Sequence, residues 1–179
     1  MNAPLDVPEL RAGQNHRLRP WSLDDLDVVR EASEDAYIPL ITSVPSAYTD
    51  TEGAAFVRRQ WARAAEGVGY SFAIAELATG RAIGQIGLWP GAHGRASVEY
   101  WVAPSGRRQG AAAAALLALS SWGLTGLRIA RLELHVEPWN TASSRTAERA
   151  GFTLEGLLRS WQEVGGERRD MYVYSKIGR

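Results

Sequence analysis

A strand, a helix of small residues and a second strand follow one another in the middle of the chain. The segment ASVEYWVAP, residues 96–104, has the period of a strand and stops at Pro104. The apolar run that begins at Ala111 predicts a helix from about residue 109 to about residue 124. In ARLELHVEP, residues 130–138, apolar and polar side chains alternate. Because a strand–helix–strand unit makes its two strands parallel neighbours, the sequence predicts one parallel pair inside a larger sheet.

Hairpins and helices surround this central unit. Two pairs of strand-like segments each flank a short turn that contains glycine, and they predict antiparallel hairpins. The paired segments are 70–77 with 82–90, and 152–164 with 168–177. Three more segments have helical spacing, with Ser22 and Asn140 as N-caps of two of them. These helices are expected over 22–35, 49–66 and 140–151.

These elements, together with a short extended segment at 17–21, predict a mixed α/β fold. We expect a mostly antiparallel central sheet of about seven strands with flanking helices. The chain has 179 residues, the usual size of one domain, so residues 15–179 are expected to form a single domain. Residues 1–14, with two prolines and few large apolar side chains, are expected to be a loose N-terminal arm.

The composition excludes several classes of function. Lysine and arginine (20) balance aspartate and glutamate (20), which argues against a nucleic-acid or membrane-surface partner. The chain has no cysteine, so a thiol nucleophile and thiolate metal ligands are excluded, and its three histidines are scattered; we expect no metal. No basic segment followed by an apolar one opens the chain, so we expect no signal peptide and a cytoplasmic protein.

The junction GRRQGAAAAA, residues 106–115, has the features of an anion-binding site. The first turn of a helix has free N–H groups and the positive end of the helix dipole. Gly110 and the alanines leave room for a bulky ligand, and Arg107 and Arg108 add positive charge. The sequence is neither a P-loop nor a dinucleotide-binding G-x-G-x-x-G motif. The alanines alone are explained by helix propensity and close packing on a sheet.

Arg107-x-x-Gly110-x-Ala112 resembles the acyl-CoA signature of the GNAT superfamily of N-acetyltransferases. The segments EYWVAPSGRRQGAA, RLELHVEPWNTASSRTAERAGF and EGLLRSWQEVGGERRDMYVYS are similar, in order and spacing, to the ribosomal-protein N-terminal acetyltransferase-like branch. The resemblance covers about Arg17 to Ile177 and implies an acyl-CoA N-acyltransferase-like domain. It also implies a sheet splayed between the fourth and fifth strands, and it leaves a homodimer open because such enzymes are often dimers.

The resemblance implies that acetyl-CoA is the co-substrate. Its pyrophosphate would lie on backbone N–H groups of the turn and helix, Arg107 would orient it, and its pantetheine arm would pair with the 96–104 strand. Asn140 would bond the pantetheine, although an N-cap needs no such function. The cofactor-binding residues implied are Trp101, Val102, Arg107, Arg108, Gln109, Gly110, Ala111, Ala112, Asn140 and Ser143.

Three residues are candidates for the chemistry of acetyl transfer. By resemblance, Ser143 lies near the sulfur as its proton donor. Glu99 is a candidate general base, since a carboxylate in a strand made for burial is costly unless it is paired or hydrated. The alternative for Glu99 is an ion pair with Arg95 or Arg131. Asp170 is a second candidate base, and its alternative role is to anchor the closing hairpin.

The expected activity is direct transfer of an acetyl group from acetyl-CoA to a primary amine. An α-amine is about a tenth neutral at pH 7, whereas a lysine amine is neutral about once in 2,500, which favours a peptide or protein N-terminus or a small amino compound. Trp139 and Trp161 are expected to line the substrate cleft. Two alternatives remain: a catalytically idle acyl-CoA-binding or regulatory module on the same fold, and an unrelated phosphate-binding protein.

Overall fold

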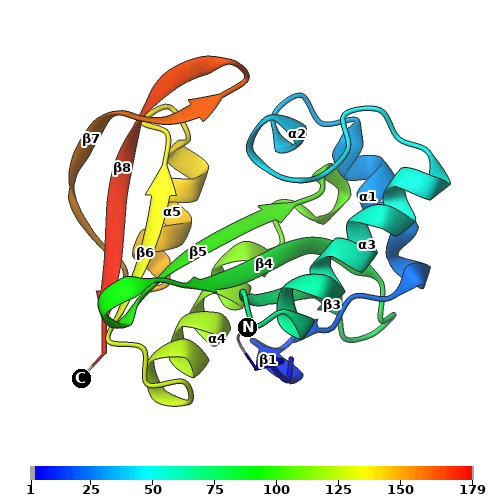
Figure 1. Cartoon of the computed structure of the whole chain (residues 1–179), viewed down its shortest axis with the longest axis horizontal. Coiled ribbons are helices and arrows are strands. Elements are labelled where there is room, and N and C mark those ends of the chain that lie inside the picture. The colour runs from blue at the N-terminus through cyan, green and yellow to red at the C-terminus, as the bar shows by residue number, and fades with distance from the viewer. Residues whose placement is uncertain (1–2, 179) are drawn as a thin grey trace.

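A computed structural model describes residues 3–178, which fold around one twisted sheet of eight strands (Figure 1). The strands are β1 (Leu10–Ala12), β2 (His16–Arg19), β3 (Tyr70–Glu76), β4 (Ala82–Pro90), β5 (Arg95–Val102), β6 (Arg131–Val136), β7 (Thr153–Val164) and β8 (Glu167–Ile177). The α-helices are α1 (Leu26–Ser33), α2 (Ile38–Ile41), α3 (Asp50–Ala65), α4 (Ala111–Thr125) and α5 (Thr141–Arg149). Short 3₁₀ helices are η1 (Leu23–Asp25), η2 (Ala92–Gly94) and η3 (Pro104–Gly106).

The sheet has the order β1-β2-β3-β4-β5-β6-β8-β7. All neighbouring strands are antiparallel except β5 and β6, the parallel pair expected from the strand–helix–strand unit. The β5–β6 register runs only from Arg95 opposite Arg131 to Ser97 opposite Glu133. Beyond Ser97 the two strands separate, as Figure 1 shows. The expected splay between the fourth and fifth predicted strands is therefore confirmed.

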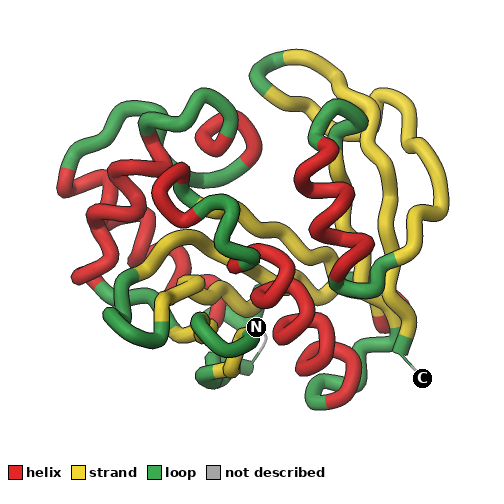
Figure 2. The backbone as a smooth tube through the Cα atoms, turned by 180° about the vertical axis from the view of Figure 1, so that it is seen from behind, coloured by secondary structure: helices red, strands yellow, loops and turns green. Residues whose placement is uncertain are grey.

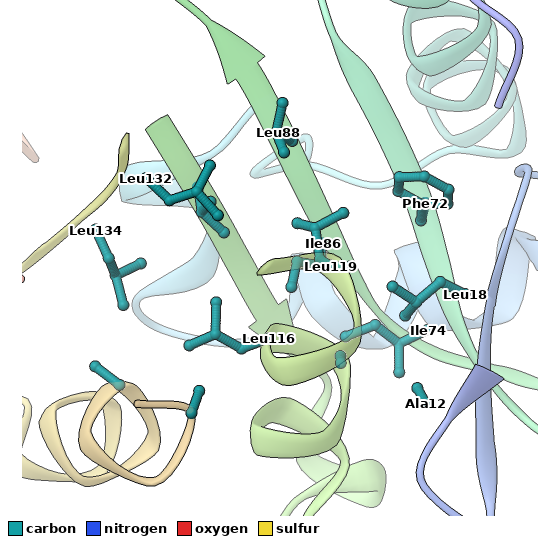
Figure 3. Close-up of a cluster of buried hydrophobic side chains, with 14 of the residues drawn as sticks. Ala12, Leu18, Phe72, Ile74, Ile86, Leu88, Leu116, Leu119, Leu132 and Leu134 are labelled. Carbon is teal, nitrogen blue, oxygen red and sulfur yellow. The ribbon is translucent and has the colours of Figure 1, made fainter. Parts of the chain in front are cut away.

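Helices cover both faces of the sheet. Figure 2 shows α4 and α5 on one face, where Leu116 and Leu119 of α4 are fully buried against the strands (Figure 3). The other face carries α1 and α3, whose buried side chains include Phe56 and Val57. Each helix therefore buries one apolar stripe against a central sheet, the arrangement expected of a mixed α/β fold.

The predicted N-caps position two of the helical segments. Ser22 accepts a hydrogen bond from the Asp24 N–H and completes a capping box with Asp25. Asn140 Oδ1 accepts a hydrogen bond from the Ser143 N–H at 3.1 Å, so α5 begins directly after Asn140. Because β6 ends at Val136, this cap places the start of α5 shortly after the end of β6.

Two segments differ from the sequence-based expectation. Within the expected loose arm, residues 1–14, Leu10–Ala12 form strand β1, and Ala12 is completely buried. The Leu5 N–H donates to the Ala64 carbonyl at 2.8 Å, so the description of a loose arm is wrong for these residues. Helix α2 was also not expected. Within residues 3–178, no helix combines the length and apolar character needed to cross a membrane.

Candidate active site

A cavity of about 1050 Å³ lies at the gap between β5 and β6. Its walls include residues from both faces of the sheet: Tyr100 belongs to the α4–α5 face, and Trp101 to the α1–α3 face. Twelve of the fourteen residues predicted for the site line this cavity. These are Glu99, Trp101, Val102, Arg107, Arg108, Gly110, Ala111, Ala112, Trp139, Asn140, Ser143 and Trp161.

The N-terminus of α4 opens onto the cavity. Gly110 has φ 74°, a left-handed conformation that glycine adopts without strain, and it caps α4 without any side-chain hydrogen bond. The first hydrogen bond of the helix runs from the Ala114 N–H to the Gly110 carbonyl at 3.0 Å. The N–H groups of Ala111, Ala112 and Ala113 therefore have no partner within the helix. A Cβ atom at Gly110 would meet no atom within 4 Å, so the space beside this turn is open.

Arg107 holds the turn before α4 in place. Its Nε donates to the Val102 carbonyl at 3.0 Å, and its Nη2 lies 2.6 Å from Asp35 Oδ2 in the loop after α1. Because both partners belong to the protein itself, Arg107 organises the turn. The neighbouring Arg108 has no ion pair within the described chain. Gln109 lies outside the cavity, and its amide donates to the Ser105 carbonyl at 3.3 Å.

The free edge of β5 faces the gap. The Ala103 N–H donates to the Ile83 carbonyl of β4 at 2.9 Å. Because N–H groups alternate between the two edges of a strand, the N–H groups of Val102 and Tyr100 point to the opposite edge. That edge has no partner strand there, since pairing with β6 ends at Ser97. Trp101 differs from the expectation: its backbone faces β4, and its indole N–H bonds Gln85 at 3.0 Å.

Ser143 and Tyr100 meet across the gap. The Tyr100 hydroxyl lies 2.6 Å from Ser143 Oγ, and either oxygen can be the donor. Burial raises the pKa of Tyr100, although the nearby hydroxyls of Ser143 and Thr146 oppose this rise, so the phenol keeps its proton at neutral pH. Asn140 uses its side-chain carbonyl oxygen as the cap of α5. The residue lines the cavity, and its amide nitrogen has no partner in the described chain.

Glu99 lies on the other side of β5 from Tyr100. The surrounding protein raises the pKa of Glu99 by displacing water, while the Trp89 indole and the positive charge of Arg63 oppose this rise. The side chain nevertheless remains accessible to solvent, because it borders the open cavity. The alternative ion pairs are absent: within the described chain, Arg95 pairs with Glu133, and Arg131 pairs with Glu133 and Glu155.

Asp170 is outside the cavity. Its Oδ1 accepts a hydrogen bond from the Ser160 N–H at 2.7 Å, at a bulge where β7 slips in register between Leu158 and Gln162. Ser160 has φ 51°, a left-handed conformation that an ordinary residue adopts only with local support. This geometry is that of the alternative role, since Asp170 anchors the bulge that precedes Trp161, and a role as catalytic base stays a prediction.

Aromatic residues enclose the α1–α3 side of the cavity. The Tyr37 hydroxyl donates to Glu137 Oε1 at 2.6 Å, and the Trp139 indole donates to Glu137 Oε2 at 2.9 Å. Glu137 is 5% exposed, so this carboxylate ties the loop after α1 to the loop after β6. Trp161 stacks on His135, with ring centroids 5.4 Å apart. Burial lowers the pKa of His135, although Glu133 opposes this, so the imidazole is neutral at neutral pH.

The sequence did not point to several residues of this cavity. Tyr37, Arg63 and Glu137 come from three separate elements, and only the fold brings them to one wall. Tyr100 alternates with Val98 and Val102 in the sequence, a pattern that indicates an apolar face. One local signal was available, the pattern Glu-x-Trp-Asn at 137–140. It places the Glu137 carboxylate and the Trp139 indole N–H shortly before the cap residue Asn140. Within residues 3–178, no group of three or more acidic, histidine or cysteine side chains has a metal-binding arrangement.

Known proteins are similar to this chain in both sequence and fold. Residues 16–153 match the family model described as acetyltransferase (GNAT) domain. The "uncharacterized N-acetyltransferase p20" of Bacillus licheniformis is 29% identical over 165 residues, which cover 90% of this chain and 92% of that protein.

Two solved structures show the same arrangement of elements. RimJ of Mycobacterium smegmatis, in complex with a CoA disulfide, superposes with a TM-score of 0.80 and 27% identity, covering 96% of this chain and 86% of that chain. RimL, a ribosomal-protein alpha-N-acetyltransferase in complex with coenzyme A, gives a TM-score of 0.82 at 20% identity, covering 96% and 98%. The second likeness concerns the fold alone.

Proposed function

The chain belongs to the acetyltransferase (GNAT) domain family, and we propose that it transfers an acetyl group from acetyl-CoA directly to a primary amine. One observation carries this proposal: a single cavity joins the open N-terminus of α4 to Glu99 through the gap between β5 and β6. A donor held on the α4 side and an amine on the α1–α3 side would meet where the sheet is split. Holding two substrates in contact makes their reaction effectively unimolecular, which lowers the entropic part of the activation free energy.

The residues present fit acetyl-CoA. The left-handed Gly110, the free N–H groups of Ala111 to Ala113 and the positive charge of Arg108 form a cradle for a pyrophosphate. The unpaired edge of β5 at Val102 and the amide of Asn140 offer hydrogen bonds to the amide groups of a pantetheine arm. When bound, acetyl-CoA supplies an acetyl group activated as a thioester.

The chain's own residues supply proton transfer and charge stabilisation. Glu99, whose pKa is raised toward neutrality, is suited to accept a proton from the acceptor ammonium group. The backbone N–H groups along the free edge of β5 are oriented to stabilise a developing negative charge. Ser143 Oγ, hydrogen-bonded to the protonated Tyr100, holds a proton for the leaving group.

The proposed acceptor is an α-amine, either of a peptide or protein or of a small amino compound. The RimL protein with the same fold is an alpha-N-acetyltransferase of ribosomal protein, which supports a protein N-terminus as one acceptor. The chemistry supports the same class, because an α-amine has the lower pKa and needs less help from a base than a lysine amine does.

Release of free CoA from acetyl-CoA tests this proposal, with a panel of peptides bearing free or blocked N-termini, amino acids and lysine side-chain amines. We expect release that depends on a free α-amine and falls in Ser143→Ala. Binding of acetyl-CoA without release across the whole panel would support the idle module instead.

A further inference from the structure

Arg63 is a cation on the acceptor side of the cavity. It lies near the end of α3, is half-buried, and lines the same cavity as Glu99. Its guanidinium carbon is 4.5 Å from the centroid of the Trp89 ring, a cation–π contact. Its other contact is a marginal 3.4 Å hydrogen bond to Ser43 Oγ.

No carboxylate of residues 3–178 lies within 4.0 Å of the Arg63 guanidinium. Glu99 attracts it from a greater distance, while burial and the like charge of Arg59 both disfavour its charged form. A half-buried charge without a close counter-ion is costly, and arginine pairs best with a planar anion such as a carboxylate. The position of Arg63 therefore favours a ligand that brings its own negative charge into the cavity.

Trp89 keeps this guanidinium in a defined place. A Cβ atom at Gly69 would lie 2.3 Å from the indole of Trp89, and one at Gly87 would lie 2.4 Å from it. Both glycines therefore make the space in which the indole is packed. Gly87 is also the register partner of Glu99, which places the carboxylate beside the same indole. A fixed cation and a nearby carboxylate form a pre-organised pair of opposite charges.

From this arrangement we infer that the acceptor carries a carboxylate close to its amine, with the carboxylate bound by Arg63 and the amine directed to Glu99. This inference rests on the proposed N-acetyltransferase function and names its substrate class. The carboxylate has two sources: the α-carboxylate of a free amino acid, or an acidic side chain at one of the first positions of a peptide.

The test compares acceptors with and without this carboxylate, at equal concentrations of the neutral amine. One arm pairs free amino acids with their amides, and the other pairs peptides that begin with aspartate or glutamate with their asparagine or glutamine counterparts. The wild type is expected to acetylate the anionic member of the pair with a kcat/KM about 10- to 100-fold higher, the usual size of a charge-assisted hydrogen bond. The arm that shows the preference identifies the source of the carboxylate.

Arg63→Met is expected to bring the ratio of anionic to neutral kcat/KM close to one, mainly through the KM of the anionic acceptor. Arg58→Met is the matched control, because Arg58 lies on the same helix α3, is exposed and does not line the cavity. Equal use of anionic and neutral acceptors by the wild type overturns the inference and leaves the proposed function intact. This comparison uses the wild type alone, so its result does not depend on whether a variant folds. Failure to acetylate any amine overturns both.

Discussion

The surroundings of Glu99 raise the pKa of its carboxyl group, which favours a role as a base and disfavours the ionised form in the folded protein. Water is displaced around it, and within the described chain no cation lies within ion-pair distance, so the charged form is disfavoured in the folded protein. A base with a pKa moved toward neutrality is more effective than an ordinary carboxylate. The same shift means that the folded protein is less stable when Glu99 is ionised than when it is neutral.

Glu99→Gln should therefore lower activity and raise stability at neutral pH. We expect kcat to fall by about 10²- to 10⁴-fold, because a positioned base is lost. The raised pKa makes the folded state hold the proton more tightly, so the wild type loses stability as pH rises from 4.5 through the folded pKa. Denaturant titration should show Glu99→Gln more stable at about pH 8 and equal to the wild type at about pH 4. A variant that is less stable at both values would contradict this account.

Ser143 and Tyr100 form a hydrogen-bonded pair of hydroxyl groups. Ser143→Ala removes the hydroxyl that faces Tyr100 and should lower kcat by about 100-fold, with little change in acetyl-CoA affinity. Tyr100→Phe keeps the serine but releases its hydroxyl from the 2.6 Å contact, so its kcat should fall between those of Ser143→Ala and the wild type. The neighbouring Ser144→Ala lies outside the cavity and serves as the control. Steady-state kinetics that rank Tyr100→Phe equal to the wild type would remove Tyr100 from the mechanism.

At the scale of elements, the loop after α1 connects the two sides of the split sheet. Asp35 bonds Arg107 beyond the end of β5, and Tyr37 bonds Glu137 beyond the end of β6. Asp35 also accepts hydrogen bonds from the Tyr37 and Ile38 N–H groups, which start α2. This short connection spans the gap and defines one end of the cavity.

Tyr37→Phe should loosen this connection. The change leaves the buried Glu137 with one hydrogen bond fewer, and the loss of one bond to a buried charged group costs about 1–3 kcal/mol. We expect a higher acceptor KM and faster amide hydrogen exchange at residues 36–42. Tyr48→Phe is the control, since Tyr48 bonds the exposed Asp50 outside the cavity. Unchanged exchange in Tyr37→Phe would show that the loop is held by other contacts.

At the scale of the whole molecule, the sequence predicted the elements that repeat a regular pattern. The strand–helix–strand unit, both hairpins and two N-caps were predicted because alternation, turn glycines and capping residues act locally. Strand β1 was not, because its three residues carry too little pattern and depend on pairing with β2. The wall of the cavity next to the N-terminus of α4 was predicted, because residues 106–112 form one contiguous motif.

The acceptor side could not be predicted in the same way. Tyr37, Arg63 and Glu137 come from the loop after α1, from α3 and from the loop after β6, and each alone has an ordinary structural explanation. Asp170 illustrates the converse, since its position in the chain suggested chemistry and the fold uses it to support a bulge. Long-range packing decides both cases, and one sequence does not encode it in any local pattern.

A calorimetric titration of the wild type, Gly110→Trp and Gly166→Trp with acetyl-CoA tests most directly whether the N-terminus of α4 binds this ligand. Both glycines have positive φ, 74° and 83°, and both have open space where a Cβ would be, so the two variants carry a similar backbone strain. Gly110 lines the cavity, whereas Gly166 lies in the turn between β7 and β8, outside it. We predict micromolar binding by the wild type and by Gly166→Trp, and none by a folded Gly110→Trp. Absence of binding to the wild type, or equal binding to all three proteins, would contradict this prediction.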